Sequence, residues 1–207
     1  MILDLTYAEA TADIEKVLAP GGFAKARVFI ARHRGRRFVV KDFGSKGFWE
    51  RNLIGRMVIS REFRAYRALA GIDGLLAAAK RLSPFSLAVE YLDGIDFGGL
   101  TRGEIGRDVI EQFECIVNDL HSRGWVHLDL QRRSNILLVN GKVFVVDLAS
   151  AFHPGGIPLI GRGLTRILGF FDRLSLIKLK TVYAPDSLTR TERKWLKARN
   201  LVMPTKW

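Results

Sequence analysis

The stretch of residues 120–147 holds the side chains that are best suited to chemistry. Asp129 lies in a predicted loop just after His127, where a helix has ended. Asn135 follows six residues later, and Asp147 follows the next pair of apolar runs. A carboxylate can accept a proton, and carboxylate and amide oxygens are ligands that hard cations such as Mg²⁺ prefer.

The order of these residues resembles the catalytic centre of the protein-kinase-like fold. That family carries His-x-Asp, then Asn, and a further Asp after the next hairpin. Here a hairpin is predicted because the apolar runs 136–139 and 143–146 flank Asn140-Gly141, a strong two-residue turn. The resemblance covers residues 21–150.

The resemblance implies a role for each residue. Asp129 would accept the proton of the acceptor hydroxyl, and Asn135 and Asp147 would hold Mg²⁺. His127 would brace the loop. Phosphoryl transfer needs positioning and charge neutralisation around the γ-phosphate of ATP more than covalent chemistry. The alternative is that Asp129 caps a turn and that Asp147 is a surface residue at a strand end.

A lysine and a glutamate earlier in the chain complete the catalytic set that the resemblance implies. Lys41 lies on the second strand of a hairpin predicted around Arg34-Gly35 and would reach the α- and β-phosphates. Glu62, in the following amphipathic helix, would pair with Lys41. Glu50 competes for that role, and Glu62 could instead be an exposed partner of neighbouring basic residues.

The remaining nucleotide contacts are also implied by the resemblance. The segment 89–92 resembles the hinge, where the backbone of Glu90 and Leu92 would bind adenine beside the gatekeeper Val89. The glycine-rich loop aligns onto 21–28 and keeps only its first glycine. The predicted nucleotide-binding residues are therefore Gly21, Gly22, Val28, Lys41, Val89, Glu90 and Leu92.

The chain departs from the family pattern at three further points. Five residues separate Asp129 from Asn135, where the motif has four. Leu128 replaces the arginine that pairs with an activating phosphate, which predicts activity without activation-loop phosphorylation. The triplet 147–149 lacks the usual Phe and Gly, which argues against a flipping activation switch.

The elements around these residues predict an α+β fold. Apolar periodicity and turn residues predict helices, strands and hairpins in the order helix, hairpin, helix, strand, helix, hairpin and helices. The first helix is expected over 6–18, because Thr6 and Glu9 form a capping-box pattern. We expect a two-lobed minimal kinase-like fold, with a β-rich nucleotide-binding lobe at 1–92 and a reduced helical lobe at 93–207.

Composition adds expectations about partners and location. The 207 residues include 33 Lys and Arg against 21 Asp and Glu, a net charge of +12, which favours anionic partners. One cysteine excludes an intrachain disulfide and suits a reducing compartment. No signal peptide or long apolar run is recognised, so we expect a cytoplasmic protein, with a peripheral position at the inner membrane face as an alternative.

Three hypotheses about the function remain open. Only 60 residues follow Asp147, with no Ala-Pro-Glu, and this reduced half resembles lipopolysaccharide sugar kinases (acting on Kdo or heptose) and RIO kinases. The first hypothesis is an ATP- and Mg²⁺-dependent kinase of a sugar or glycolipid hydroxyl. The second is a minimal Ser/Thr protein kinase of the RIO type, and the third is a non-catalytic nucleotide-binding pseudokinase.

Two basic segments bear on that choice. The segment 163–180 mixes apolar and basic residues and is either a core helix or a membrane-facing surface. The basic segment 32–37 at a hairpin tip is either an exposed turn or a nucleic-acid contact, and nucleic acid is the less favoured partner.

Overall fold

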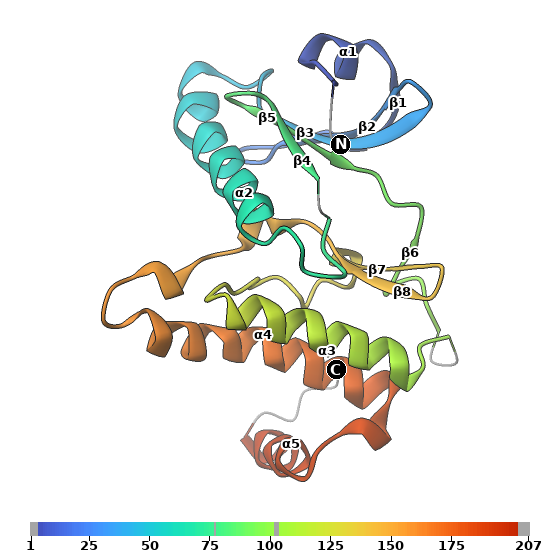
Figure 1. Ribbon diagram of the computed structural model, residues 1–207, viewed down its shortest axis with the longest axis vertical. Helices are drawn as coiled ribbons and strands as arrows, with labels where there is room; N and C mark the ends of the chain where they lie inside the picture. Colours follow the sequence, from blue (N-terminus) through green and yellow to red (C-terminus); the bar gives the residue numbers. More distant parts are fainter. Residues whose placement is uncertain (1–3, 77, 102–103, 203–207) are drawn as a thin grey trace. The chain divides into compact units, whose positions relative to one another are not determined.

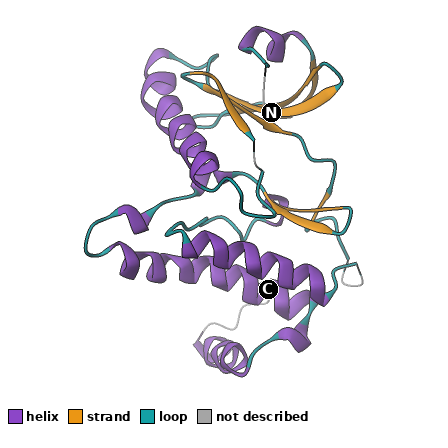
Figure 2. Cartoon of the chain, viewed as in Figure 1, coloured by secondary structure: helices purple, strands orange, loops and turns teal. Residues whose placement is uncertain are grey.

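The computed structural model describes residues 4–76, 78–101 and 104–202, with side chains described up to residue 197. The chain divides into two compact units (Figures 1 and 2). The N-terminal unit comprises Met1–Asp93 and Asp147–Ala151, and the C-terminal unit comprises Gly94–Val146 and Phe152–Trp207. The first is rich in strands and the second in helices, so the predicted α+β class is confirmed.

The N-terminal unit is built on a five-stranded antiparallel sheet in the order β1-β2-β3-β5-β4. The β2–β3 hairpin forms as predicted, because Arg34 and Gly35 both adopt the positive φ values, 48° and 74°, that a tight two-residue turn needs. Phe29, Phe38 and Val40 on these strands are buried in its core. The strands are β1 Ile14–Ala19, β2 Arg27–His33, β3 Arg36–Asp42, β4 Ala79–Ser83 and β5 Ser86–Glu90.

The expected helix over 6–18 is wrong in its second half. The capping box of Thr6 and Glu9 does start a helix, but that helix, α1 (Tyr7–Ala12), ends before Asp13. Residues 14–19 form β1, an edge strand paired with β2. Backbone pairing with a neighbouring strand overrides the weak helical preference of this short stretch.

One long helix supports the sheet of the N-terminal unit. A π-helical turn (Glu50–Gly55) runs directly into α2 (Arg56–Ala68), the amphipathic helix predicted to carry Glu62. The buried face of α2 includes Ile59, Ala65 and the charged residue Glu62. It packs on β4, β5 and the 3₁₀ turn η3 (Leu148–Ser150), so the returning segment 147–151 is part of this unit.

The C-terminal unit combines a small sheet with long helices. The strands β6 (Ile95–Asp96), β7 (Ile136–Val139) and β8 (Lys142–Val145) form the sheet, and Asn140-Gly141 makes the predicted turn. The helices α3 and α4 lie side by side (Figure 1). The helices are α3 Arg107–Ser122, α4 Gly161–Tyr183 and α5 Arg190–Val202, with 3₁₀ turns at Arg133–Asn135, Pro154–Gly156 and Pro185–Ser187.

The two basic segments have different environments. The whole segment 163–180 lies in α4, whose inner face is buried. No helix in the described parts of the chain is long and apolar enough to cross a membrane. The arginines of the hairpin segment 32–37 each lie within 4 Å of a carboxylate, which weakens the nucleic-acid interpretation. These pairs are Arg32–Glu15, Arg34–Asp4, Arg36–Glu90 and Arg37–Asp93.

Candidate functional site

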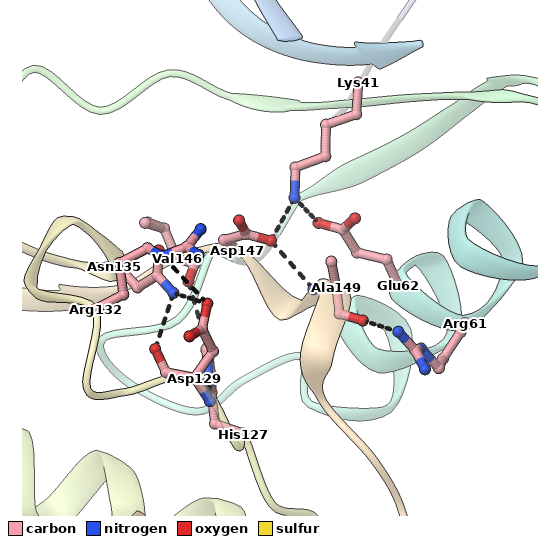
Figure 3. A network of polar contacts seen from close by, with 10 residues as sticks. All are labelled: Lys41, Arg61, Glu62, His127, Asp129, Arg132, Asn135, Val146, Asp147 and Ala149. Atoms are coloured by element: carbon pink, nitrogen blue, oxygen red, sulfur yellow. Dashed lines mark hydrogen bonds and ion pairs between the residues drawn. The ribbon is translucent and has the colours of Figure 1, made fainter. Parts of the chain in front are cut away.

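Three charged residues that are distant in sequence meet in the N-terminal unit. The Nζ of Lys41 lies 2.7 Å from Oε1 of Glu62 and 2.5 Å from Oδ1 of Asp147 (Figure 3). Lys41 extends from β3, Glu62 from the middle of α2, and Asp147 begins the returning segment. The Lys41–Glu62 contact has the geometry expected of that pair, while the contact of Lys41 with Asp147 was not expected.

The returning segment is held in place by its own hydrogen bonds. Asp147 has a left-handed backbone, with φ of 63°, and its Oδ1 accepts from the amide of Ala149 at 3.3 Å. The guanidinium of Arg61, next to Glu62 on α2, donates to the carbonyl of Ala149. The same helix therefore positions both Glu62 and the turn that carries Asp147.

Burial and charge pairing have opposite effects on the pKa values in this cluster. The side chain of Glu62 is fully buried and that of Lys41 is 13% exposed. Burial acts to lower the pKa of Lys41, but the carboxylates of Glu62 and Asp147 outweigh it and raise that pKa above its usual value. Burial also raises the pKa of Glu62, against the opposing effect of the Lys41 ammonium. Lys41 is therefore a cation at neutral pH.

Replacing Lys41 by methionine is expected to lower the free energy of unfolding by about 3–5 kcal/mol, because it leaves the buried Glu62 carboxylate without its partner. Urea unfolding at neutral pH measures this loss. The double variant Lys41→Met/Glu62→Gln should recover much of it, since the buried charge is then gone. Lys16→Met, at an exposed position on β1, is the control. Equal losses in the single and double variants would contradict the prediction.

In the C-terminal unit, Asn135 reaches Asp129 despite the five-residue interval. The Nδ2 of Asn135 donates to the backbone carbonyl and to Oδ2 of Asp129, each at 3.0 Å (Figure 3). A 3₁₀ turn over Arg133–Asn135 accommodates the extra residue. Asn135 is buried, whereas the carboxylate of Asp129 is 31% exposed and near the guanidinium of Arg132. The Asp129 carboxylate is therefore accessible from solvent.

His127 lies inside this loop and is fully buried. Its Nε2 lies 3.4 Å from the carbonyl of Val146, and its Nδ1 accepts from the amide of Asp129 at 3.4 Å. The ring thus bridges the Asp129 loop and the end of β8. This position suits a bracing role and offers no exposed nitrogen for catalysis.

Asp172 is a positioning residue that the sequence analysis missed. It lies on α4, is 1% exposed, and accepts from the backbone amides of His127 and Leu128 at 2.8 Å each. Its Oδ2 also lies 3.0 Å from Nε2 of His121. Leu128 has a left-handed backbone with φ of 66°, a costly conformation for leucine that these bonds maintain. A lone aspartate within an apolar helix was the available signal, because a buried carboxylate needs partners.

The segment aligned with the glycine-rich loop is a tethered turn between β1 and β2. Gly21 has φ of 80°, and a Cβ there would lie 3.0 Å from backbone atoms of residues 25 and 27. Glu50 accepts from the amide of Ala24 at 2.9 Å, and the Nζ of Lys46 donates to the carbonyl of Gly22 at 2.8 Å. Glu50 therefore holds this loop, and Glu62 is the partner of Lys41. Val28 pairs with Lys41 across the β2–β3 ladder.

The predicted hinge continues β5. Val89 is buried and pairs with Val39 of β3. The amide of Tyr91 donates to a carbonyl of β3 at 3.1 Å, so the carbonyl of Glu90, one residue earlier, points away from β3. On that other side the pairing with β4 ends at Val89. The Glu90 carbonyl therefore points to the side of β5 on which the β4 pairing has ended.

Comparisons with known proteins give a similarity to a protein kinase. No protein-family model matches the chain. The chain is similar to the cell cycle protein kinase DBF2 of Saccharomyces cerevisiae, with 24% identity over 147 residues. The match covers 67% of this chain and 26% of the yeast protein, so the chain corresponds to about a quarter of that protein. This similarity indicates a protein-kinase-like relationship and supports neither the lipopolysaccharide-kinase branch nor the RIO branch.

Proposed function

We propose that the protein is a kinase that transfers the γ-phosphate of Mg-ATP to an alcohol hydroxyl. The observation that carries the proposal is the cluster of Lys41, Glu62 and Asp147, in which a buried glutamate and a second carboxylate hold a charged lysine. A lone buried ion pair is weak support for stability, but a fixed ammonium is well suited to binding phosphate. The similarity to a protein kinase supports the same reaction class.

Each residue then has a defined task. Lys41 binds the α- and β-phosphates, and Glu62 fixes its position. Asp147 and Asn135 offer the carboxylate and amide oxygens that Mg²⁺ prefers. Mg²⁺, when bound, neutralises charge that develops on the phosphate oxygens. Asp129 accepts the proton of the attacking hydroxyl.

The adenine ring would be bound mainly through backbone groups of the hinge. The carbonyl of Glu90 and the amide of Leu92 would hydrogen-bond the ring, with Val89 against it. The tethered loop that contains Gly21 and Gly22 would lie near the phosphates together with Val28. Because this loop is closed by its own turn, its contribution would come from few backbone amides.

For the acceptor, we favour a sugar or glycolipid hydroxyl over a protein side chain. The net charge of +12 suits an anionic acceptor, and the first half of α4 exposes large apolar side chains such as Ile167 and Phe171. These features also support a peripheral position at a membrane surface. The alternative is a minimal Ser/Thr protein kinase, favoured by the similarity to one. A non-catalytic nucleotide-binding protein is the second alternative, favoured by the reduced glycine loop.

The test is transfer of labelled γ-phosphate from Mg-ATP into a bacterial lysate that is then separated into glycolipid and protein fractions. Label in glycolipid that depends on Asp129 supports the favoured acceptor. Label in protein supports the minimal protein kinase instead. Nucleotide binding without turnover, by the purified chain offered both fractions, supports the non-catalytic alternative and overturns the proposed reaction.

Treatment with a protein phosphatase is expected to leave the rate of phosphoryl transfer unchanged. Leu128 occupies the position at which the resemblance implies an arginine that would pair with an activating phosphate, so no such phosphate is needed. The rate is measured before and after treatment, with removal of phosphate followed by mass spectrometry. A regulated kinase treated in parallel should lose activity. Loss of activity by this protein would contradict the prediction.

A further inference from the structure

A cavity of about 560 Å³ in the C-terminal unit is lined by basic side chains. It lies where the end of α3 and the turn 153–156 meet the first half of α4. Its volume is in the range of small-molecule sites. The residues that matter most for its chemistry are four arginines and two histidines: Arg123, Arg162, Arg166, Arg173, His121 and His153.

The four arginines line the same cavity. Arg162, Arg166 and Arg173 are spaced by four and seven residues along α4, which places them on one face of the helix. Arg123 joins them from the end of α3. No carboxylate is among the described residues that line the cavity. A guanidinium binds phosphate oxygens through two parallel N–H groups, so four of them suit a ligand with at least one phosphate group.

The backbone segments beside the cavity are closely packed. The imidazole of His153 stacks on the indole of Trp125, with ring centroids 4.9 Å apart. A Cβ on Gly155 would lie 2.7 Å from the Cα of Gly124, so the two backbone segments are in close contact. The amide of Gly155 donates to the carbonyl of Gly124 at 3.0 Å. A site that exists before its ligand arrives loses little entropy on binding.

An apolar surface borders the basic face. Phe170, 41% exposed, lies next to the arginines on the helix surface. Farther round the helix, about 140° from the arginines at 3.6 residues per turn, Ile160, Ile167 and Phe171 share one face. They are 62%, 66% and 49% exposed, and Leu159 just before them is fully exposed. A basic face beside an exposed apolar face is the pattern of a segment that binds an anionic lipid surface.

We propose that this cavity binds a phosphomonoester headgroup, and that the apolar face contacts the lipid that carries it. This inference concerns a binding site, and it does not depend on phosphoryl transfer. The shared chemistry of possible ligands is a phosphomonoester. Its source is either a lipid in a membrane or a soluble phosphosugar, and the apolar face favours the lipid.

The test measures binding of the full chain to vesicles of phosphatidylcholine with and without phosphatidic acid. The triple variant Arg162→Gln/Arg166→Gln/Arg173→Gln is expected to lose roughly hundredfold in affinity for the acidic vesicles, since each arginine near the surface contributes about 1 kcal/mol. The matched control removes the same charge from exposed positions on α5: Arg190→Gln/Lys194→Gln/Lys197→Gln. Thermal unfolding checks that each variant is folded. If the triple variant does not fold, the single variant Arg166→Gln is measured in its place.

The outcomes distinguish binding in the cavity from nonspecific electrostatic attraction to the vesicle surface. A much smaller loss in the control supports the cavity, whereas equal losses in both triple variants overturn it. Glucose 1,6-bisphosphate is titrated by calorimetry as the soluble probe. Binding of this probe that is lost in the Arg162/Arg166/Arg173 variant supports the cavity with a soluble source. Ile167→Ser/Phe171→Ser should weaken vesicle binding only, and failure of the unaltered chain to bind either probe overturns the proposal.

Discussion

Alanine at position 129 is expected to reduce phosphoryl transfer by about a thousandfold while leaving the affinity for ATP nearly unchanged. A positioned general base typically contributes about 10²–10⁴-fold to the rate. The loop should persist, because Asn135 also donates to the backbone carbonyl of Asp129, which the substitution keeps. Steady-state transfer of labelled phosphate gives the rate, and calorimetric titration with a non-hydrolysable ATP analogue gives the affinity.

Two companion variants sharpen this result. Asp129→Asn keeps the shape of the side chain and removes its basicity, so it should be about as inactive as Asp129→Ala. Asp119→Asn changes an exposed aspartate on α3 in the same unit and should be fully active. Full activity in Asp129→Ala would show that another residue accepts the proton. Loss of nucleotide affinity would show that Asp129 has a structural role instead.

Alanine at position 172 is expected to lower the free energy of unfolding by about 2–6 kcal/mol and to reduce transfer strongly. The substitution leaves the amides of His127 and Leu128 without their acceptor inside the protein, and each buried unpaired donor costs about 1–3 kcal/mol. Without those bonds, the strained backbone at Leu128 is free to relax and to move Asp129. Urea unfolding gives the stability, and the transfer assay at saturating ATP gives kcat.

The role of Asp172 differs from that of a merely buried residue in one measurable way. In the folded Asp172→Ala protein, kcat should fall while the affinity for ATP is kept, because the substitution disturbs the Asp129 loop. His121→Ala removes only the imidazole partner of Asp172, so it should have a smaller effect. Asp186→Ala, at an exposed position, is the control. An unchanged urea midpoint in Asp172→Ala would contradict the prediction.

The parts of the fold that the sequence could predict depend on local chemistry. Both hairpins form around their predicted turns because Arg34-Gly35 and Asn140-Gly141 adopt the backbone angles that such turns need. Residues 14–18 were predicted as part of a helix because the capping box of Thr6 and Glu9 is real, but it starts a helix of only six residues. The strand β4, with the sequence Ala-Lys-Arg-Leu-Ser, lacks the β-branched residues that mark a strand and is formed by pairing with β5.

The candidate site shows the same division between local and distant contacts. The order of motifs was enough to select Lys41 and Glu62 as a pair, and the structure places them in contact. The bond between Lys41 and Asp147 spans 106 residues of sequence, and the bonds of Asp172 are made to backbone amides about 45 residues away. The sequence could have marked Asp172 as an aspartate that needs partners, but backbone amides carry no sequence signal, so it could not have identified the amides of His127 and Leu128 as those partners.

The N-terminal unit is discontinuous in sequence, and this affects when it can complete its folding during synthesis. A nascent chain that has emerged as far as Asp93 contains all five strands and α2, but it lacks the segment Asp147–Ala151 that completes the unit. At that stage Lys41 has only Glu62 as its partner. Domains generally fold as units while the ribosome extends the chain at about 5–20 residues per second. Completion of the Lys41–Glu62–Asp147 cluster must therefore wait several seconds, until the β7–β8 hairpin and Asp147 have left the ribosome.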